Sequence, residues 1–258
     1  MPHELIKVDE QYDGQVSSIV LGPPPGNILT AAVMAELSAQ LEATSADGRK
    51  KLVVIAGEGK HFCFGASVEE HTPEKVGEML PAFHDMIGRV LNCDVPIVAK
   101  VSGVCLGGGF ELALACSMIF CDERAAFGVP EIQLGVFPPP ACALLPFKCS
   151  ESAARRIILT GDKISADEAF RLGIVESVAE KGQLDETVSM FAEEHILPKS
   201  ASSLRIANKA AMTMLSAIYS ENIKKVEMLY LEKLMSTADA VEGITAFLEK
   251  RAPQWKDE

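Results

Sequence analysis

The sequence predicts an α/β protein with parallel strands, on two observations. Short apolar runs, typical of buried strands, alternate along the first half of the chain with longer segments whose apolar residues recur at helical spacing. Most of these runs are separated by enough residues to hold a crossover helix, which parallel strands require. At 258 residues the chain can bury a large core, and we expect one domain with a small appendage.

The N-terminal half alternates strand and helix patterns. Asp13-Gly14 lies between two apolar runs, which is a strong hairpin signal. Thr30 is a good N-cap for the helix that follows the glycine- and proline-rich segment 22–26. The elements expected here are, in order, a hairpin of strands 5–8 and 16–21, a helix at 31–44, a strand at 52–56, a helix at 74–92, a strand at 96–101, a helix ending near 116 and a strand at 117–121.

The C-terminal half is mostly helical after Pro146. Ser165 is expected to cap a helix that ends at Gly173. The other elements expected here are a helix at 150–159, a short strand at 174–178 and helices from 185 to about 250, interrupted at 198–200. We place a boundary near this interruption, between a core domain of residues 1–195 and a C-terminal helical segment of residues 196–258.

Composition and charge exclude several classes of partner. The formal net charge is −12, which argues against a nucleic-acid or anionic-membrane surface, so an anionic substrate would need a local basic patch. The longest apolar stretch, 95–121, contains Lys100, Glu111 and three glycines, and we interpret it as buried strand, turn and helix rather than a membrane span. Cysteines in apolar runs, histidines without ligand spacing and the absence of a secretory-signal pattern indicate a reduced, cytoplasmic protein without a metal site.

Three consecutive glycines, Gly107, Gly108 and Gly109, stand at the expected start of a helix. The first turn of a helix has free N–H groups and the positive end of the helix dipole, and glycine lets a ligand atom approach that backbone closely. Negative charge on a carbonyl oxygen bound there would be stabilised, and the loop 62–67 could provide a second N–H donor. The alternative is a glycine turn that only allows close packing. The spacing matches neither the phosphate-binding loop nor the dinucleotide-binding motif.

Two glutamates follow the glycines. Glu111 falls in the first turn of an apolar helix, and Glu131 falls in a Pro-Glu-Ile turn. Two carboxyl groups close together in a buried site hold one proton more tightly than the other. One can then accept a proton from water while the other delivers a proton to carbon. The alternatives are that Glu111 only complements the helix dipole and that Glu131 only makes a hydrogen bond in its turn.

Four segments of the sequence resemble the crotonase superfamily, also called the enoyl-CoA hydratase/isomerase family. They are HFCFGASVEE, VSGVCLGGGFELALACSMIFCDERAAFGVPEIQLGVFP, TGDKISADEAFRLGIVESV and EGITAFLEKRAPQW. The resemblance implies a crotonase-like spiral of ββα units with a C-terminal helical segment for trimerisation, assembled as a homotrimer or a dimer of trimers. It also implies an acyl-CoA thioester substrate and no cofactor, because coenzyme A is part of the substrate.

The resemblance also assigns roles to individual residues. The thioester carbonyl oxygen would lie between the backbone N–H groups of Ala66 and Gly108. Glu111 would activate water, and Glu131 would protonate the α-carbon. The residues expected to bind the acyl-CoA are Phe64, Gly65, Gly107, Pro139, Phe247 and Lys250, the last two at the CoA nucleotide, often of a neighbouring subunit. Lys250 and Arg251 would supply the basic patch; the alternative is that they form an exposed helix end.

Two departures from the family pattern bear on the substrate. The usual hydratase has Pro-Gly-Ala-Gly-Gly where this chain has Pro-Pro-Pro-Ala-Cys at 138–142, and Pro139 has no N–H to donate. The first block commonly has Asp where this chain has Ser67. These features resemble a branch that hydrates a cyclic conjugated dienoyl-CoA, cyclohexa-1,5-diene-1-carbonyl-CoA, to 6-hydroxycyclohex-1-ene-1-carbonyl-CoA. A hydro-lyase with this substrate is the expected function.

Other functions are weighed against this one. A general 2-enoyl-CoA hydratase of fatty-acid degradation is the alternative within the same chemistry. A Δ3,Δ2-enoyl-CoA isomerase needs only one base, so the two glutamates favour hydration. A catalytically silent scaffold that binds acyl-CoA or RNA is disfavoured by the glutamate pair, and RNA binding also by the charge and the 6% aromatic content. A serine or cysteine hydrolase is disfavoured because the sequence has no G-x-S-x-G motif.

Overall fold

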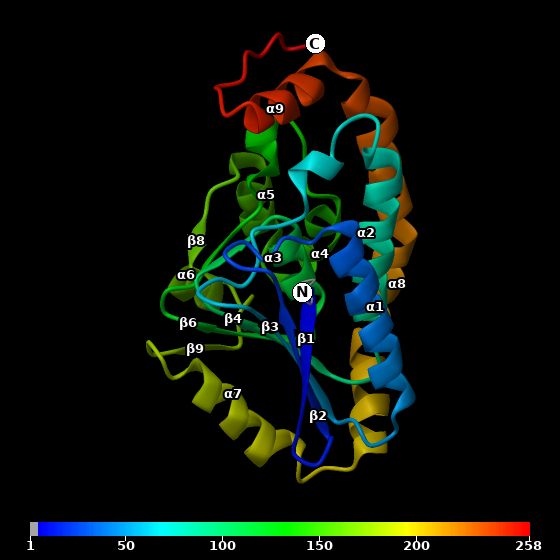
Figure 1. The fold of residues 1–258 in the computed structure, drawn as a ribbon, viewed down its shortest axis with the longest axis vertical. Helices are drawn as coiled ribbons and strands as arrows, with labels where there is room; N and C mark the ends of the chain where they lie inside the picture. The colour runs from blue at the N-terminus through cyan, green and yellow to red at the C-terminus, as the bar shows by residue number, and fades with distance from the viewer. Residues whose placement is uncertain (1–4) are drawn as a thin grey trace.

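A six-stranded sheet forms the centre of the molecule. The computed structural model describes residues 5–258, and its large sheet has the strand order β1-β2-β3-β4-β6-β9 (Figure 1). Its strands are β1 (Ile6–Gln11), β2 (Val16–Leu21), β3 (Leu52–Gly57), β4 (Ile97–Val101), β6 (Met118–Asp122) and β9 (Ser177–Ala179). β1 and β2 pair antiparallel, and the other neighbouring strands pair parallel. The predicted α/β class with crossover connections is therefore confirmed.

The N-terminal hairpin forms as predicted. Tyr12, Asp13 and Gly14 have φ angles of 52°, 55° and 78°, the left-handed backbone that tight hairpin turns favour. The turn fixes the register in which Gln11 pairs with Val16. β2 then pairs in parallel with β3 and so joins the hairpin to the rest of the sheet.

A second, three-stranded sheet was not predicted. It has the order β5-β7-β8 and consists of β5 (Val104–Leu106), β7 (Ala126–Gly128) and β8 (Ile164–Ser165). Strands of two or three residues are too short to show an alternating pattern in the sequence. β5 leads directly into the glycine triplet, so this small sheet positions the start of α3 (Gly108–Ala115).

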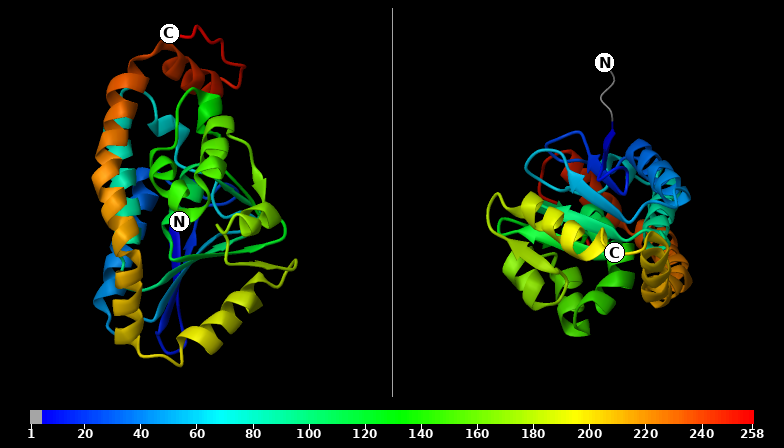
Figure 2. Two further views of the ribbon diagram at one scale, coloured as in Figure 1. Left: turned by 180° about the vertical axis from the view of Figure 1, so that it is seen from behind. Right: turned by 90° about the horizontal axis from the view of Figure 1, so that it is seen from below.

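Three long helices pack together beside the large sheet: α1 (Ala31–Ala46), α2 (Val76–Leu91) and α8 (Ala201–Met228). α2 contacts both α1 and α8, and α8 runs along the long axis of the molecule (Figure 2). Thr30 caps α1 as predicted, because its hydroxyl accepts a 3.3 Å hydrogen bond from the Val33 N–H. The predicted apolar face of α2 is buried in the core.

Nine shorter helical segments also form within residues 5–258, and all but η1 lie in the C-terminal half of the chain. They are η1 (Val68–Glu70), η2 (Pro130–Leu134), α5 (Glu151–Thr160), α6 (Ala166–Arg171), α7 (Leu184–Phe191), η3 (Ala192–Ile196), η4 (Leu229–Lys233), η5 (Leu234–Ser236) and α9 (Ala238–Leu248). Ser165 caps α6 as predicted, accepting a 3.2 Å hydrogen bond from the Glu168 N–H. The strand predicted at 174–178 exists as β9 but begins later.

The run of three prolines contains the start of a helix that was not predicted, α4 (Pro139–Lys148). Pro139 and Pro140 occupy its first two positions, where a helix makes no use of a backbone N–H and where the fixed φ of proline fits. The helical pattern was expected only after Pro146, but Pro146 itself lies inside α4. The first turn of α4 reaches the candidate site, where the Ala141 N–H contacts Glu111.

The C-terminal segment packs on the rest of the chain. α8 contacts α2 and α4, and α9 contacts η1 and η2. The interruption predicted at 198–200 separates η3 from α8, while the division of the chain at residue 195 stays a prediction. The apolar stretch 95–121 is buried as strand, turn and helix, as expected. In the part of the chain that the structure describes, no helix has the length and apolar character needed to cross a bilayer.

Candidate active site

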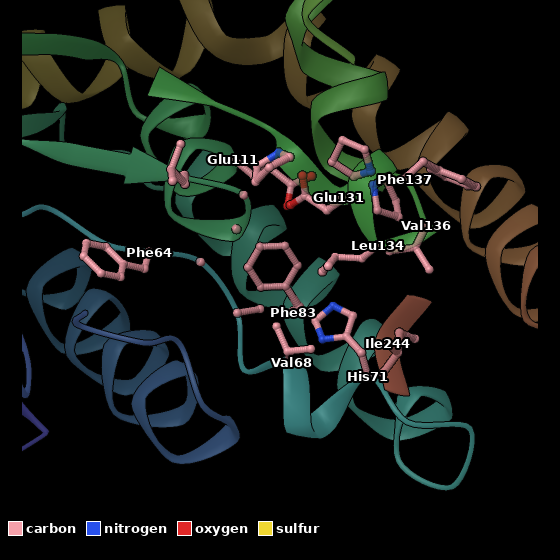
Figure 3. Close-up of a pocket in the computed structure, with 18 of the residues that line it drawn as sticks. Phe64, Val68, His71, Phe83, Glu111, Glu131, Leu134, Val136, Phe137 and Ile244 are labelled. Carbon is pink, nitrogen blue, oxygen red and sulfur yellow. The ribbon is translucent and has the colours of Figure 1, made fainter. Parts of the chain in front are cut away.

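A largely apolar cavity of about 370 Å³ opens beside the N-terminus of α3. Segments far apart in the sequence contribute to its wall, and the apolar side chains among them include Val68, Leu80, Phe83, Leu134, Val136 and Ile244. Figure 3 shows the carboxyl groups of Glu111 and Glu131 close together at one end of this cavity. An apolar cavity with a few convergent polar groups is a good candidate for a ligand site.

Each of the three glycines at the start of α3 has its own structural reason. A Cβ atom would lie 2.5 Å from Oε1 of Glu131 if added at Gly107, 2.9 Å from the backbone nitrogen of Ala66 if added at Gly108, and 2.7 Å from Cβ of Cys63 if added at Gly109. Gly107 also has a φ of 51°, which favours glycine. Gly109 therefore fits the alternative of a glycine that only allows close packing. Gly107 leaves room beside the Glu131 carboxyl group, and Gly108 leaves room beside the Ala66 N–H.

Two backbone N–H groups in the cavity wall have no acceptor. Within residues 5–258, neither the Ala66 N–H nor the Gly108 N–H donates a hydrogen bond. Ala66 forms a parallel bridge with Leu29, whose hydrogen bonds go to the residues on either side of Ala66, so the Ala66 N–H points the other way. Gly108 is the first residue of α3, where N–H groups lack an intrahelical partner. Both residues line the same cavity, as the predicted oxyanion hole requires, and the hole itself stays a prediction.

Glu111 is held by the first turn of α4. It is 3% exposed, and its Oε1 accepts a 2.8 Å hydrogen bond from the Ala141 N–H. Pro139 indeed has no N–H, but the chain supplies the donor at Ala141, so the departure at 138–142 leaves Glu111 with a partner. Burial raises the pKa of Glu111 well above its ordinary value, and the charge of Glu131 raises this pKa further, while the Ala141 N–H opposes the rise.

The carboxyl group of Glu131 has a different environment from that of Glu111. Its Oε2 is buried and has no hydrogen-bond partner, while its carboxyl group accepts a hydrogen bond from its own backbone N–H. The choice between the acid role and the turn alternative therefore stays a prediction. Burial raises the pKa of Glu131 to about 7. Because the two carboxyl groups are near enough for one charge to act on the other, they do not both ionise easily. The pair therefore retains a proton near neutral pH.

Nine of the ten residues predicted for the site line this cavity. They are Phe64, Gly65, Ala66, Gly107, Gly108, Glu111, Glu131, Pro139 and Phe247. Lys250 is not among the lining residues and lies just beyond the end of α9. The expectation that Arg251 adds free positive charge is wrong, because its guanidinium is paired with Glu242 and Glu249. The chemical roles assigned to these residues stay predictions.

Three polar residues in the cavity wall were not predicted: His71, Lys163 and Tyr230. Nδ1 of His71 lies 2.8 Å from the Ser67 carbonyl oxygen, and burial lowers the pKa of His71. The ring is thus neutral and donates from Nδ1. Lys163, just before β8, is a basic residue in the cavity wall, whereas Lys250 does not line the cavity. These residues come from three distant segments, so no spacing in the sequence marks them as neighbours.

Comparison with known proteins assigns this fold and site to a class. Residues 11–258 match the model of the enoyl-CoA hydratase/isomerase family, and the fold and site define an enzyme of the crotonase type. The chain belongs to the enoyl-CoA hydratase/isomerase family. The predicted crotonase-like fold is confirmed, and the chain is an enzyme of the hydratase type, that is, a hydro-lyase.

Individual relatives cover nearly the whole chain. The sequence is 38% identical over 252 residues to a cyclohexa-1,5-dienecarbonyl-CoA hydratase from Thauera aromatica, covering 98% of this chain and 97% of that protein. It is 33% identical to a probable enoyl-CoA hydratase from Bacillus subtilis (strain 168), with coverages of 95% and 97%. The crystal structure of an enoyl-CoA hydratase from Mycobacterium avium subsp. paratuberculosis K-10 has the same fold, with a TM-score of 0.87 at 24% identity, covering 99% of this chain and 100% of that one.

Proposed function

We propose that the protein adds water to a conjugated unsaturated acyl-CoA, and that this substrate is cyclohexa-1,5-diene-1-carbonyl-CoA. The observation that carries the reaction type is the meeting of two buried carboxyl groups and two free backbone N–H groups in one cavity. The choice of a cyclic diene is supported by the 38% identity to the Thauera aromatica hydratase over nearly the full chain.

The thioester carbonyl oxygen binds between the Ala66 and Gly108 N–H groups. Glu111 takes a proton from water, the water oxygen bonds to the β-carbon, and the electron pair of the double bond moves through the conjugated system onto the thioester oxygen. Glu131 then delivers its proton to carbon. In the cyclic diene that carbon is the remote end of the conjugated system, because the product keeps a double bond next to the thioester. No electrons leave the substrate, so the reaction needs no redox cofactor.

The hydrogen bonds at the two glutamates support this division of roles. The Ala141 N–H donates to Glu111 and favours its ionised form, which suits a base, although burial and the charge of Glu131 act against it and raise the pKa of Glu111. Oε2 of Glu131 has no donor, and burial raises the pKa of Glu131 to about 7, so this carboxyl group can hold the proton that an acid delivers. The two roles reverse when the enzyme removes water from the product.

The cavity wall supports a flat, apolar acyl group. Pro138 and Pro139 line the cavity together with the rings of Phe83 and Phe137. Proline has no backbone N–H and a rigid ring, so this part of the wall offers apolar surface instead of hydrogen bonds. A six-membered ring that carries no polar atoms fits such a surface. A straight-chain 2-enoyl group is the alternative substrate.

We also propose that the active form is a homotrimer or a dimer of trimers, as the family resemblance implies. Phe247 lines the cavity but is 53% exposed, and Trp255 in the C-terminal tail is 45% exposed. Large exposed apolar side chains are candidates for surfaces that bind a ligand or another chain. Both interpretations fit Phe247, at the mouth of the cavity.

A panel of CoA esters tests the proposed function. Purified protein is incubated in ¹⁸O-labelled water with a saturated, a straight-chain 2-enoyl, a 3-enoyl and a cyclic dienoyl thioester, and mass spectrometry measures the gain of one water. Labelled product from the cyclic diene supports the proposal. Labelled product from the 2-enoyl ester alone would instead identify a straight-chain enoyl-CoA hydratase. Conversion of the 3-enoyl ester without label, and no hydration elsewhere, would mean an isomerase.

A further inference from the structure

Tyr230 lines the cavity but has no part in the reaction proposed above. Its side chain is 1% exposed, and its ring packs edge-on against that of Phe137 with centroids 5.3 Å apart. Its hydroxyl is buried and has no hydrogen-bond partner. Buried tyrosines usually find a partner for the hydroxyl, because an unsatisfied buried donor is costly. The free protein therefore maintains an unfavourable polar group in the wall of its cavity.

The backbone at Tyr230 also departs from a regular helix. α8 passes directly into η4, a π-helical segment that contains Tyr230. π-helical turns are rare and occur frequently at functional sites, and this one connects the end of α8 to the 3₁₀ turn η5. The neighbouring Leu229 is 55% exposed whereas Tyr230 is buried, so this segment directs the tyrosine inward. Burial, backbone and an unpartnered hydroxyl thus agree that the side chain is placed for the cavity.

A second unpartnered polar atom faces the same cavity. Oε2 of Glu131 is buried without a hydrogen-bond partner. Burial raises the pKa of the Tyr230 phenol, and the nearby charges of Glu131 and Glu111 raise it further, so the hydroxyl stays a donor. Tyr230 therefore offers a donor, and ionised Glu131 offers an acceptor. An alcohol oxygen, with one O–H and two lone pairs, can satisfy both.

We propose that Tyr230 donates a hydrogen bond to the oxygen atom that the enzyme adds to the acyl group, and so recognises the hydroxyl of a hydroxyacyl-CoA. The inference rests on the proposed hydration. Once Glu131 has given its proton to carbon, its carboxylate can accept from the new hydroxyl while Tyr230 donates to it. In the reverse direction the Tyr230 O–H stabilises the oxygen as its bond to carbon breaks, and water leaves.

The test separates the hydroxyl from the rest of the ligand. In a Glu111→Gln background, where water is neither added nor lost, calorimetry measures the dissociation constants of 2-hydroxycyclohexane-1-carbonyl-CoA and cyclohexane-1-carbonyl-CoA. Adding Tyr230→Phe should raise the Kd of the hydroxylated ligand about tenfold, the effect of one hydrogen bond. The Kd of the ligand without the hydroxyl should stay within about twofold of its starting value. Equal changes for both ligands, or no change for either, would overturn the proposal.

Tyr219 provides the matched control. It is also buried in the C-terminal helices, but its hydroxyl donates a 3.1 Å hydrogen bond to the His84 carbonyl and does not line the cavity. Tyr219→Phe should therefore lower the melting temperature and leave the preference for the hydroxylated ligand intact. Tyr230→Phe should leave the melting temperature unchanged or raise it, because it removes an unsatisfied group. If the role of Tyr230 were purely structural, Tyr230→Phe would lower the melting temperature and leave the preference for the hydroxylated ligand intact.

The two proposals fail in different ways. If the wild-type protein incorporates no labelled oxygen but Tyr230→Phe still abolishes the preference for the hydroxylated ligand, hydration is wrong and the hydroxyl site stands. If hydration is observed while Tyr230→Phe leaves that preference unchanged, the role of Tyr230 is wrong and the proposed function stands.

Discussion

Glu111 and Glu131 carry the proton transfers of the proposed reaction, so an isosteric change of either should remove them. Glu111→Gln keeps an oxygen for the Ala141 N–H but takes no proton from water, and Glu131→Gln delivers none to carbon. We expect each variant to lower kcat by about 10²–10⁴-fold, with little change in the affinity for an unreactive acyl-CoA. Steady-state kinetics and calorimetry measure these two quantities. Wild-type turnover in both variants would remove the acid/base assignment.

The buried position of Glu131 should also appear in the pH dependence of stability. Its pKa is about 7 in the folded protein and has an ordinary value of 4.5. The folded state therefore binds the proton more tightly, and this contribution is present below pH 4.5 and is lost as the pH rises through 7. We expect Glu131→Gln to gain stability relative to wild type between pH 5 and pH 8, by about 1–3 kcal/mol at 1.36 kcal/mol per pKa unit.

Denaturant unfolding of both proteins at the two pH values measures this difference. Glu36 lies on the exposed side of α1, and Glu36→Gln gives the reference for a glutamate that faces solvent. Its effect on the free energy of unfolding should be the same at both pH values. A Glu131→Gln variant that behaves like the reference would contradict the buried, shared site.

At the level of elements, the start of α3 decides whether the oxyanion hole is open. A Cβ at position 108 would lie 2.9 Å from the Ala66 nitrogen and 3.1 Å from the Phe83 ring, in the space where a thioester oxygen would bind. We expect Gly108→Ala to lower kcat by about 10²–10³-fold, the loss measured when one donor is removed from such a site. The measurement is kcat with the CoA ester that the protein hydrates.

Gly77 supplies the matched control in another helix. It lies in the first turn of α2, and a Cβ added there meets no atom within 4 Å. Gly77→Ala should keep the wild-type kcat and raise the free energy of unfolding by about 0.4–1 kcal/mol, because alanine restricts the unfolded chain. If both alanine variants lose activity alike, the defect is not specific to the donors at α3.

The elements that sequence reasoning found are those whose signals are local. Asp13-Gly14 predicts the hairpin, and Thr30 and Ser165 cap helices where expected. The elements it missed depend on tertiary contacts. β7 is three residues long and forms only because β5 and β8 lie beside it. α4 was hidden because proline usually ends a helix, although the first helical turn tolerates it.

At the scale of the whole molecule, the site could be predicted where one segment carries it. The stretch from Gly107 to Glu131 contains the glycines and both carboxyl groups, and a family pattern can be read within it. Ala141, His71 and Tyr230 complete the site from three other segments. Their proximity follows from how α4, η1 and η4 pack, and no spacing in the sequence encodes that packing. The role of Lys250 depends on a still larger unit, the proposed oligomer.

Lys250 should act on substrate binding rather than on the chemical step. It lies outside the cavity of its own chain, and we expect a solution mass three or six times that of one chain, in which Lys250 reaches the CoA nucleotide of a neighbour. Lys250→Ala should raise KM several-fold with an unchanged kcat, since the loss of an exposed charge contact costs about 1 kcal/mol. A change in kcat alone would contradict a nucleotide contact.

Mixed oligomers decide whose active site Lys250 serves. Glu111→Gln subunits have no working base but keep Lys250. Lys250→Ala subunits keep the base Glu111 but lack Lys250. If Lys250 crosses to a neighbour, co-assembled mixtures contain intact Glu111 sites beside an intact Lys250, and turnover with the wild-type KM returns. If Lys250 serves its own chain, every catalytically competent site in the mixture still lacks it, and the raised KM persists at all mixing ratios. A monomeric solution mass would exclude the crossing contact and the proposed assembly together.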